Sequence, residues 1–531
     1  MGIIVNNLSY VLQDGTTILN HISFSISSKT KCALIGANGC GKSTLINILH
    51  GILAPTEGDI SLSDTPYLVP QHYGQYNDYT VGEALGIQDK LTALKSILSG
   101  DSSNEAFEIL GDCWTIEDDA RNALDSWGLG HVHHNTVFSN LSGGEKTKAF
   151  LAGISLHNPR IILMDEPTNH LDEEARAVLY DFIDRYNGAL LVVSHDRTLL
   201  DRFPDIIEVS GNGARRFPMS FGEYLETIGN ENAALAENAE ALKKELRKAK
   251  AKARKVAEQQ QKQDARGRHH SEQKGLARIS MGNLKNQAEN CTAKLSGIHN
   301  EKISDLSKKV SEATSMINDP DRMAVDFCSS QTHAGKVLIE SRCLNHSYTG
   351  NDNLWNDSLD FVIRSGDRIQ VTGSNGSGKS TLMRIIMGNL LPSDGSIYRA
   401  DNLKCVYLDQ EYSLIDNNMT IAEQVQRFNR HSLPEHELNI RLNRFLFPAS
   451  SWHKPCSALS GGEKMRLSLC CLMVADSTPD IIIADEPTNN LDLFNQEVLT
   501  ETLEKYTGTL IVISHDSYFV KQLSLTSRIK L

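Results

Sequence analysis

The chain has 531 residues, of which 40% are hydrophobic and 22% are charged, the composition of an ordinary globular protein. This length exceeds one hydrophobic core and predicts two domains of about 200 residues with a further segment between them. No run of about 18 apolar residues occurs and no signal-peptide pattern is present, so we expect no membrane-spanning helix and a cytoplasmic protein. The ten cysteines are scattered, which argues against a zinc site and a disulfide framework.

The first predicted element with a chemical role is a phosphate-binding loop at 35–44, IGANGCGKST. It matches G-x-x-x-x-G-K-[S/T], in which backbone N–H groups close around phosphate oxygens and the lysine reaches the β- and γ-phosphates. An apolar run at 32–35 and helical spacing at 45–49 predict the strand–loop–helix setting that the motif requires. The predicted nucleotide-binding residues here are Gly36, Asn38, Gly39, Gly41, Lys42, Ser43 and Thr44.

Further motifs follow this loop, and a second region repeats all of them in the same order. The first copy continues with Gln71, the stretch LSGGE at 141–145 with Ser142 and Gly144, Asp165 and Glu166 after an apolar strand, the stretch 169–172, and His195. The second copy contains Gly373, Asn375, Gly376, Gly378, Lys379, Ser380, Thr381, Gln410, LSGGE at 459–463 with Ser460 and Gly462, Asp485, Glu486, the stretch 489–492, and His515. In both copies the histidine lies 29 positions after the glutamate, which indicates an internal duplication.

Apolar strands that alternate with helical stretches around each loop predict an α/β fold: two P-loop domains, each with a doubly wound, largely parallel sheet. We predict domain bounds of 1–228, 229–325 and 326–531. Gln71 lies 70 residues before the first LSGGE, whereas Gln410 lies 49 residues before the second, so the first copy holds about 21 extra residues. They fall between about 89 and 120 and form either a short helical projection or an ordinary surface insertion.

The segment between the two copies is strongly basic. Residues 241–300 contain 15 Lys or Arg and five Asp or Glu, a net charge of +10, so the rest of the chain sums to −23 within a total of −13. Apolar residues every three or four positions predict two long antiparallel helices, of about 30 residues each, joined by a basic tip that includes 266–270 and Lys274. This charge favours a polyanionic partner such as nucleic acid, and a solvated charged linker is the alternative.

The repeated residues fit phosphoryl transfer, in which phosphate charge is neutralised and a water is placed in line. Lysines neutralise phosphate oxygens, glutamates accept a proton from water or orient it, and histidines at strand ends reach the γ-phosphate. The predicted catalytic residues are Glu166, His195, Glu486 and His515. The predicted Mg²⁺ ligands are Ser43, Gln71, Asp165, Ser380, Gln410 and Asp485.

LSGGE places N–H groups at a helix start, where they face an anion, and it resembles the signature of the ATP-binding cassette superfamily. The stretch DEPTN at 165–169 and 485–489 strengthens the resemblance. It implies that two domains pack head to tail, so that each signature completes the other domain's ATP site. The implied partners are Ser460 and Gly462 for the site of Lys42, and Ser142 and Gly144 for the site of Lys379. Tyr10 and Tyr348 match the aromatic residue that stacks on adenine in that superfamily.

Two such domains joined by a charged helical linker, without a membrane segment, resemble the ABC-F proteins, translation factors that bind the ribosomal exit site. The resemblance implies a linker, chiefly 241–300, that contacts rRNA and tRNA, with ATP-dependent closure of two domains in what we expect to be a monomer. The insertion corresponds to the family's arm, although it is short. A transporter motor and a DNA-repair or chromosome ATPase are the alternatives. Housekeeping and antibiotic-protection roles both remain open.

Overall fold

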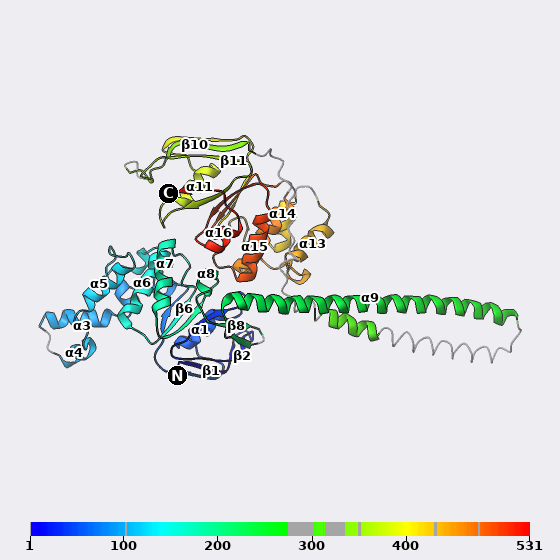
Figure 1. Ribbon diagram of the computed structural model, residues 1–531, viewed down its shortest axis with the longest axis horizontal. Coiled ribbons are helices and arrows are strands. Elements are labelled where there is room, and N and C mark those ends of the chain that lie inside the picture. The colour runs from blue at the N-terminus through cyan, green and yellow to red at the C-terminus, as the bar shows by residue number, and fades with distance from the viewer. Residues whose placement is uncertain are drawn as a thin grey trace. The chain divides into compact units, whose positions relative to one another are not determined.

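The computed structural model describes residues 2–100, 103–211, 213–273, 301–311, 313, 335–348, 352–429, 433–475 and 478–531. The chain forms two compact units (Figure 1). One unit joins Met1–Phe221 and Arg322–Leu531, here called the N-terminal and C-terminal domains. The other is Gly222–Asp321, here called the linker unit. The predicted bounds at 228 and 325 stay a prediction.

The N-terminal domain is built on a six-stranded sheet in the order β5-β6-β7-β3-β8-β9. All neighbouring strands are parallel except β8 and β9. β6 and β7 are buried along their whole length, as expected for strands covered on both faces. The bounds are β3 Lys31–Ile35, β5 Tyr67–Val69, β6 Ile161–Asp165, β7 Ala189–Val193, β8 Asp205–Ser210 and β9 Gly213–Phe217.

The C-terminal domain repeats this sheet with five parallel strands in the order β14-β15-β16-β12-β17. The corresponding strands occur in the corresponding order, which confirms the predicted α/β fold and its duplication. The bounds are β12 Arg368–Thr372, β14 Cys405–Leu408, β15 Ile481–Asp485, β16 Thr509–Ile513 and β17 Ser527–Lys530.

Each domain also has a three-stranded antiparallel sheet that was not expected from the sequence, ordered β2-β1-β4 and β11-β10-β13. The bounds are β1 Ile3–Val11, β2 Thr17–Ile26, β4 Glu57–Leu62, β10 Val337–Asn345, β11 Leu359–Arg364 and β13 Asp394–Arg399. Buried residues of β1 and β2 join the core beneath β3 and α1, so this sheet covers one face of the parallel sheet. Its strands read as alternating half-buried segments, a weaker pattern than the continuous apolar runs.

Helices connect the strands, and matching helices recur in both domains. The bounds are α1 Lys42–His50, α2 Val81–Ala84, α3 Gln88–Leu98, α4 Asn104–Leu110, α5 Ile116–Ser126, α6 Gly143–His157, α7 Glu173–Arg185 and α8 Arg197–Leu200, then α11 Lys379–Met387, α12 Ile421–Phe428, α13 Glu435–Arg444, α14 Gly461–Val474, α15 Leu493–Lys505 and α16 Ser517–Gln522. The extra residues of the N-terminal domain fall in α3 and α4, which pack together (Figure 1). α5 has its counterpart in α13, because both helices end 16 residues before the serine of LSGGE. The inserted segment is therefore helical.

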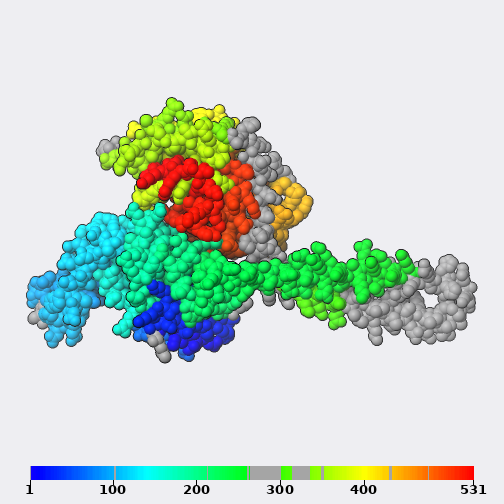
Figure 2. All heavy atoms as spheres, viewed as in Figure 1, coloured from blue at the N-terminus to red at the C-terminus, as the bar shows by residue number. Residues whose placement is uncertain are grey.

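The linker unit contains one long helix and a second helical segment. α9 spans Phe221–Gln273, and its 53 residues extend roughly 80 Å, well beyond the predicted 30 residues (bright green in Figure 2). The helix continues through position 267, because an isolated glycine costs a helix only about 1 kcal/mol. Residues 301–311 are also helical and bury Leu306. The predicted tip around Lys274 lies outside the described residues, as do the side chains of 266–270.

One glycine in each antiparallel sheet lies against the backbone of the neighbouring strand. Gly58 and Gly395 have φ values of 93° and 76°. A Cβ on Gly395 would lie 2.2 Å from the carbonyl oxygen of Cys343, and a Cβ on Gly58 would lie 2.4 Å from that of Asn7. Both positions therefore need glycine for its positive φ and for its lack of a side chain.

We expect Gly395→Ala to lower the free energy of unfolding of the C-terminal domain by about 2–3 kcal/mol, because the methyl group meets a backbone carbonyl as well as straining φ. Gly15→Ala is the matched control, since Gly15 has φ 84° and no atom within 4 Å of the point where a Cβ would lie. It should cost only about 1 kcal/mol. Urea unfolding followed by circular dichroism measures both changes. Equal losses would contradict the close approach of the strands.

Candidate functional site

The two phosphate-binding loops have the same geometry. Each follows a parallel strand and runs into a helix, and Gly41 supports the turn with φ 95°. The ammonium of Lys42 donates hydrogen bonds to the carbonyls of Gly36 (2.7 Å) and Ala37 (3.1 Å). Lys379 donates to the matching carbonyls of the second loop at 2.7 and 3.0 Å. Each lysine therefore lies across its own loop, and a bound phosphate can replace these carbonyls as the hydrogen-bond acceptor of the ammonium group.

Oxygen ligands suited to Mg²⁺ gather beside each loop. The Ser43 hydroxyl lies 3.5 Å from Gln71 Oε1, and the Ser380 hydroxyl lies 3.5 Å from Asp485 Oδ2. Asp165 is buried, and its Oδ1 has no hydrogen-bond partner among the described residues. Desolvation raises the pKa of both aspartates. A buried carboxylate oxygen without such a partner, beside neutral oxygen ligands, suits a hard divalent cation, so the residues present fit Mg²⁺.

A tyrosine distinguishes the second set of candidate Mg²⁺ ligands from the first. The Tyr407 hydroxyl donates a hydrogen bond to Asp485 Oδ2 at 2.5 Å. The duplication places Leu68 at the matching position of the N-terminal domain, and leucine cannot donate. Tyr407 was not among the predicted site residues, because only the pairing of β14 with β15 brings it beside the aspartate.

The predicted catalytic glutamates and histidines form two equivalent pairs at the ends of parallel strands. Glu166 Oε1 lies 3.5 Å from His195 Nε2, and Glu486 Oε1 lies 3.6 Å from His515 Nε2. Both glutamates have positive φ, 50° and 47°, a conformation that costs about 1–3 kcal/mol in a residue with a side chain. The same strain at both equivalent positions indicates that the surrounding fold imposes it.

Burial controls the charge of these pairs. Desolvation raises the pKa of Glu166 to about 8 and that of Glu486 to about 7. Desolvation lowers the pKa of His515 to about 4 and the pKa of His195 well below its ordinary value. The imidazoles are therefore neutral near pH 7 and can each donate one hydrogen bond and accept another.

Each LSGGE stretch begins a helix with a capping box. Ser142 donates its backbone N–H to Glu145 Oε2 (2.8 Å), and its hydroxyl accepts a hydrogen bond from the backbone N–H of Glu145 (3.4 Å). Ser460 and Glu463 form the same capping box at the start of α14. The two signatures therefore present helix N-termini of identical construction.

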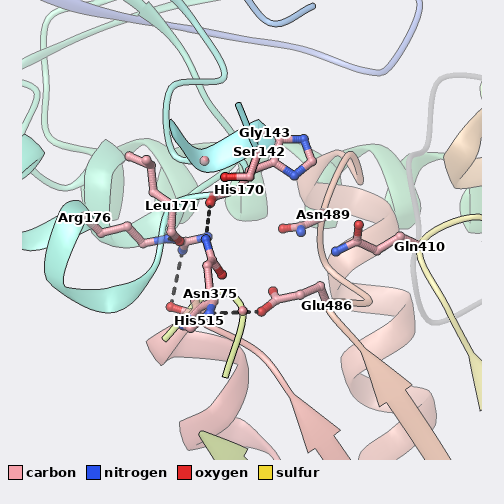
Figure 3. A pocket seen from close by; sticks show the side chains of 12 residues that line it. Ser142, Gly143, His170, Leu171, Arg176, Asn375, Gln410, Glu486, Asn489 and His515 are labelled. Atoms are coloured by element: carbon pink, nitrogen blue, oxygen red, sulfur yellow. Dashed lines mark hydrogen bonds and ion pairs between the residues drawn. The ribbon is translucent and has the colours of Figure 1, made fainter. Parts of the chain in front are cut away.

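A cavity of about 250 Å³ brings the signature of the N-terminal domain to the catalytic pair of the C-terminal domain (Figure 3). Asn375 lies in the phosphate-binding loop of the C-terminal domain, and its Nδ2 donates a hydrogen bond to the carbonyl of His170 at 2.8 Å. The cavity is lined by Ser142, Gly143, Gly144, His170, Leu171, Arg176, Asn375, Gly376, Gln410, Glu486, Asn489 and His515. Predicted residues from both domains thus line one cavity. Its other lining residues, Gly143, His170, Leu171, Arg176 and Asn489, were not among the predicted site residues.

The other phosphate loop makes equivalent contacts. The backbone N–H of Asn38 donates to Asp492 Oδ2 (2.9 Å), and its side chain donates to the carbonyl of Asn490 (2.8 Å). A Cβ on Gly461 would lie 3.9 Å from that same carbonyl. The second signature, 460–462, therefore lies next to the segment that contacts the first loop. The repeated stretches 169–172 and 489–492 were the sequence signal for these contacts.

The two tyrosines expected near adenine lie in different surroundings. Tyr348 is 65% exposed, and its hydroxyl is 2.9 Å from Thr381 Oγ1 at the start of α11. Tyr10 is half-buried and packs against the core of the N-terminal domain. Of these two tyrosines, only Tyr348 has a side-chain hydrogen bond to a predicted nucleotide-binding residue among the contacts of the described residues. Adenine stacking by either residue stays a prediction.

Comparison with known proteins agrees with this geometry. The family described as ABC transporter matches residues 19–169 and 356–489. The chain is 30% identical over 532 residues to the putative ATP-binding protein YdiF of Bacillus subtilis (strain 168), covering 96% of this chain and 77% of YdiF. It is 29% identical over 521 residues to the ribosome protection protein VmlR of the same organism, covering 98% of this chain and 84% of VmlR.

A solved complex of the archaeal ribosomal stalk protein aP1 and the archaeal ribosome recycling factor aABCE1 has a similar fold. The TM-score is 0.59 at 19% identity, over 98% of this chain and 86% of the solved chain. At this identity the likeness concerns the fold alone. Within the part of the chain that the structure describes, no helix is both long and apolar enough to cross a membrane.

We expect Glu166→Gln to stabilise the nucleotide-free protein at high pH. The folded pKa of about 8 exceeds the ordinary 4.5, so ionisation of the buried carboxyl costs stability as the pH rises. The cost is absent below the unfolded pKa and complete above the folded pKa. The thermal midpoint of the variant should therefore exceed that of the parent at about pH 9 and approach it at about pH 5. Glu174→Gln, at an exposed position, should show no such difference. An equal gain in thermal midpoint at both pH values would contradict the raised pKa of the buried Glu166 carboxyl.

Proposed function

The chain belongs to the ABC-F family of the ATP-binding cassette superfamily, and from this premise we propose that it is an ATPase that binds the ribosome and modulates translation. The observation that carries the proposal is the joining of two complete cassettes by a basic helical linker in one chain. VmlR is similar along nearly the whole chain, and its name states that it protects ribosomes. Protection of the ribosome from an antibiotic is therefore one form of the proposed function.

The linker offers a surface for a polyanion. α9 exposes basic side chains along several of its turns, and phosphate groups of RNA are the partners that such a row of cations attracts. The exposed cations are Lys244, Arg247, Lys248, Lys250, Lys252, Arg254, Lys255 and Lys262. Two acids pair with members of this helix, Glu240 with Lys244 (3.4 Å) and Glu258 with Arg254 (3.2 Å). Exposed ion pairs of this kind are weak, so the cations remain available to rRNA and tRNA.

ATP connects the two domains in the proposed mechanism. The loop of one domain holds the phosphates through its lysine and backbone N–H groups, and the signature helix of the other domain adds N–H groups from the opposite side. Mg²⁺ at the serine, glutamine and aspartate oxygens would neutralise phosphate charge when bound. Glu486 and His515 line the same cavity, so together they can orient a water and take its proton. Hydrolysis then removes the γ-phosphate that links the loop of one domain to the signature of the other. The two domains separate from each other, and the protein leaves the ribosome.

We expect a Glu166→Gln and Glu486→Gln double variant to co-sediment with ribosomes in ATP and to dissociate when ATP is withdrawn, because binding persists while hydrolysis is blocked. A Lys42→Ala and Lys379→Ala variant is the control, since it loses phosphate neutralisation and should not co-sediment. Sedimentation through sucrose with quantified protein measures both. Absence of the double variant from the ribosomal fraction in ATP would overturn the proposed function.

Removal of linker charge should weaken ribosome binding in a salt-dependent manner. Replacing Lys248, Lys252 and Lys255 with Gln should reduce the slope of log affinity against log salt by about 1 for each phosphate that is no longer neutralised. The matched control replaces Lys336, Lys521 and Lys530, which are also exposed but lie in the C-terminal domain. Ribosome binding measured at several salt concentrations gives both slopes. Identical slopes for the two triple variants would contradict the role of the linker.

A further inference from the structure

A buried arginine of the N-terminal domain reaches the catalytic pair of the C-terminal domain. Arg176 on α7 is only 8% exposed, and it lines the cavity that contains Glu486 (Figure 3). Its Nη1 donates a hydrogen bond to the backbone carbonyl of His515 at 3.3 Å, across the domain boundary. The same atom lies 3.3 Å from Asp196 Oδ2 within its own domain. One guanidinium thus connects a carboxylate of one domain to the histidine of the other domain's site.

Neighbouring groups hold this guanidinium in place. Its Nε donates to the carbonyl of Leu171 at 3.1 Å, in the segment that contacts the C-terminal phosphate loop. Asp196 also accepts a hydrogen bond from the Tyr180 hydroxyl at 2.7 Å and from the backbone N–H of Leu199 at 3.2 Å. A buried charge held by a paired carboxylate and fixed carbonyls keeps one orientation, because a change of rotamer would leave it without partners.

The duplication places no cation at the equivalent position of the other site. Asp172 corresponds to Asp492, and the residues four positions later are Arg176 and Gln496. Gln496 is buried and neutral, and its amide donates to two carbonyls of its own domain at 3.4 and 3.3 Å. The two composite sites therefore differ in charge at a position where they are otherwise built alike.

We propose that Arg176 is a positioning residue supplied in trans, which holds His515 and places a positive charge beside the site of Lys379, and that this makes the two ATP sites inequivalent. The inference deepens the proposed function and rests on ATP hydrolysis by the cassettes. A cation fixed next to the reacting phosphate lowers the energy of the charge that develops there, and because folding has already fixed its location, no reorganisation is needed during the reaction. The site of Lys42 lacks this contribution, because the duplication puts the neutral Gln496 at the matching position. ATP at the Lys379 site is therefore the faster to be hydrolysed.

The test measures Arg176→Gln in two backgrounds that each retain one catalytic glutamate. Glu166→Gln leaves the Lys379 site competent, and Glu486→Gln leaves the Lys42 site competent. Single-turnover hydrolysis of radiolabelled ATP by excess protein, without ribosomes, should slow by about tenfold for Arg176→Gln in the first background and by less than about twofold in the second. Arg176→Lys keeps the charge with fewer donors and should recover part of the loss.

The control separates this role from a general weakening of the domain interface. Glu497→Gln removes the interdomain ion pair with Arg197 (2.8 Å), which does not line the cavity. It should change both backgrounds equally. Equal slowing of both backgrounds by Arg176→Gln, no slowing in either, no recovery by Arg176→Lys, or a site-selective loss with Glu497→Gln would each overturn the proposal.

Because the assay contains no ribosomes, a protein that hydrolyses ATP unequally at its two sites but never binds ribosomes would contradict the proposed function and leave this inference standing.

Discussion

Reciprocal hydrogen bonds between each phosphate loop and the opposite domain are the constraint on which the rest of the structure depends. Asn38 donates to Asn490, and Asn375 donates to His170. Each bond ends on the stretch that follows the catalytic glutamate of the opposite domain, so the loop of one domain and the glutamate of the other are held in register. We propose that neither ATP site is assembled by one domain alone, which couples nucleotide binding to the arrangement of both domains.

The carboxylates that we propose to be catalytic are held at a cost in stability that the parallel sheets offset. Glu166 and Glu486 combine burial, which raises their pKa values, with positive φ, and both features destabilise the folded state. They follow β6 and β15, which are apolar up to their final aspartate and are hydrogen bonded on both sides, so the backbone has little freedom to relax. A rigid core thus keeps these carboxylates in place, and we propose that the shape change of the proposed function occurs at the boundary between the domains.

Features that depend on local pattern and repetition could be predicted from the sequence. The parallel strands, the loops around Lys42 and Lys379 and the signature helices all follow from short motifs in fixed order. The antiparallel sheets, whose strands have no continuous apolar run, and the full length of α9 could not. Tyr407 and Arg176 were missed for a different reason: each acquires its role through a contact made by tertiary packing, with Asp485 and with His515. The only sequence signal for them was a difference between the two copies at matching positions.

The most direct test of two composite ATP sites is a structure of the chain carrying Glu166→Gln and Glu486→Gln with ATP and Mg²⁺ bound. We predict two nucleotides, one held by Lys379 with Ser142 of the opposite signature and one held by Lys42 with Ser460. Nucleotides that each contact a single domain, with the signatures turned away from the phosphates, would contradict this prediction.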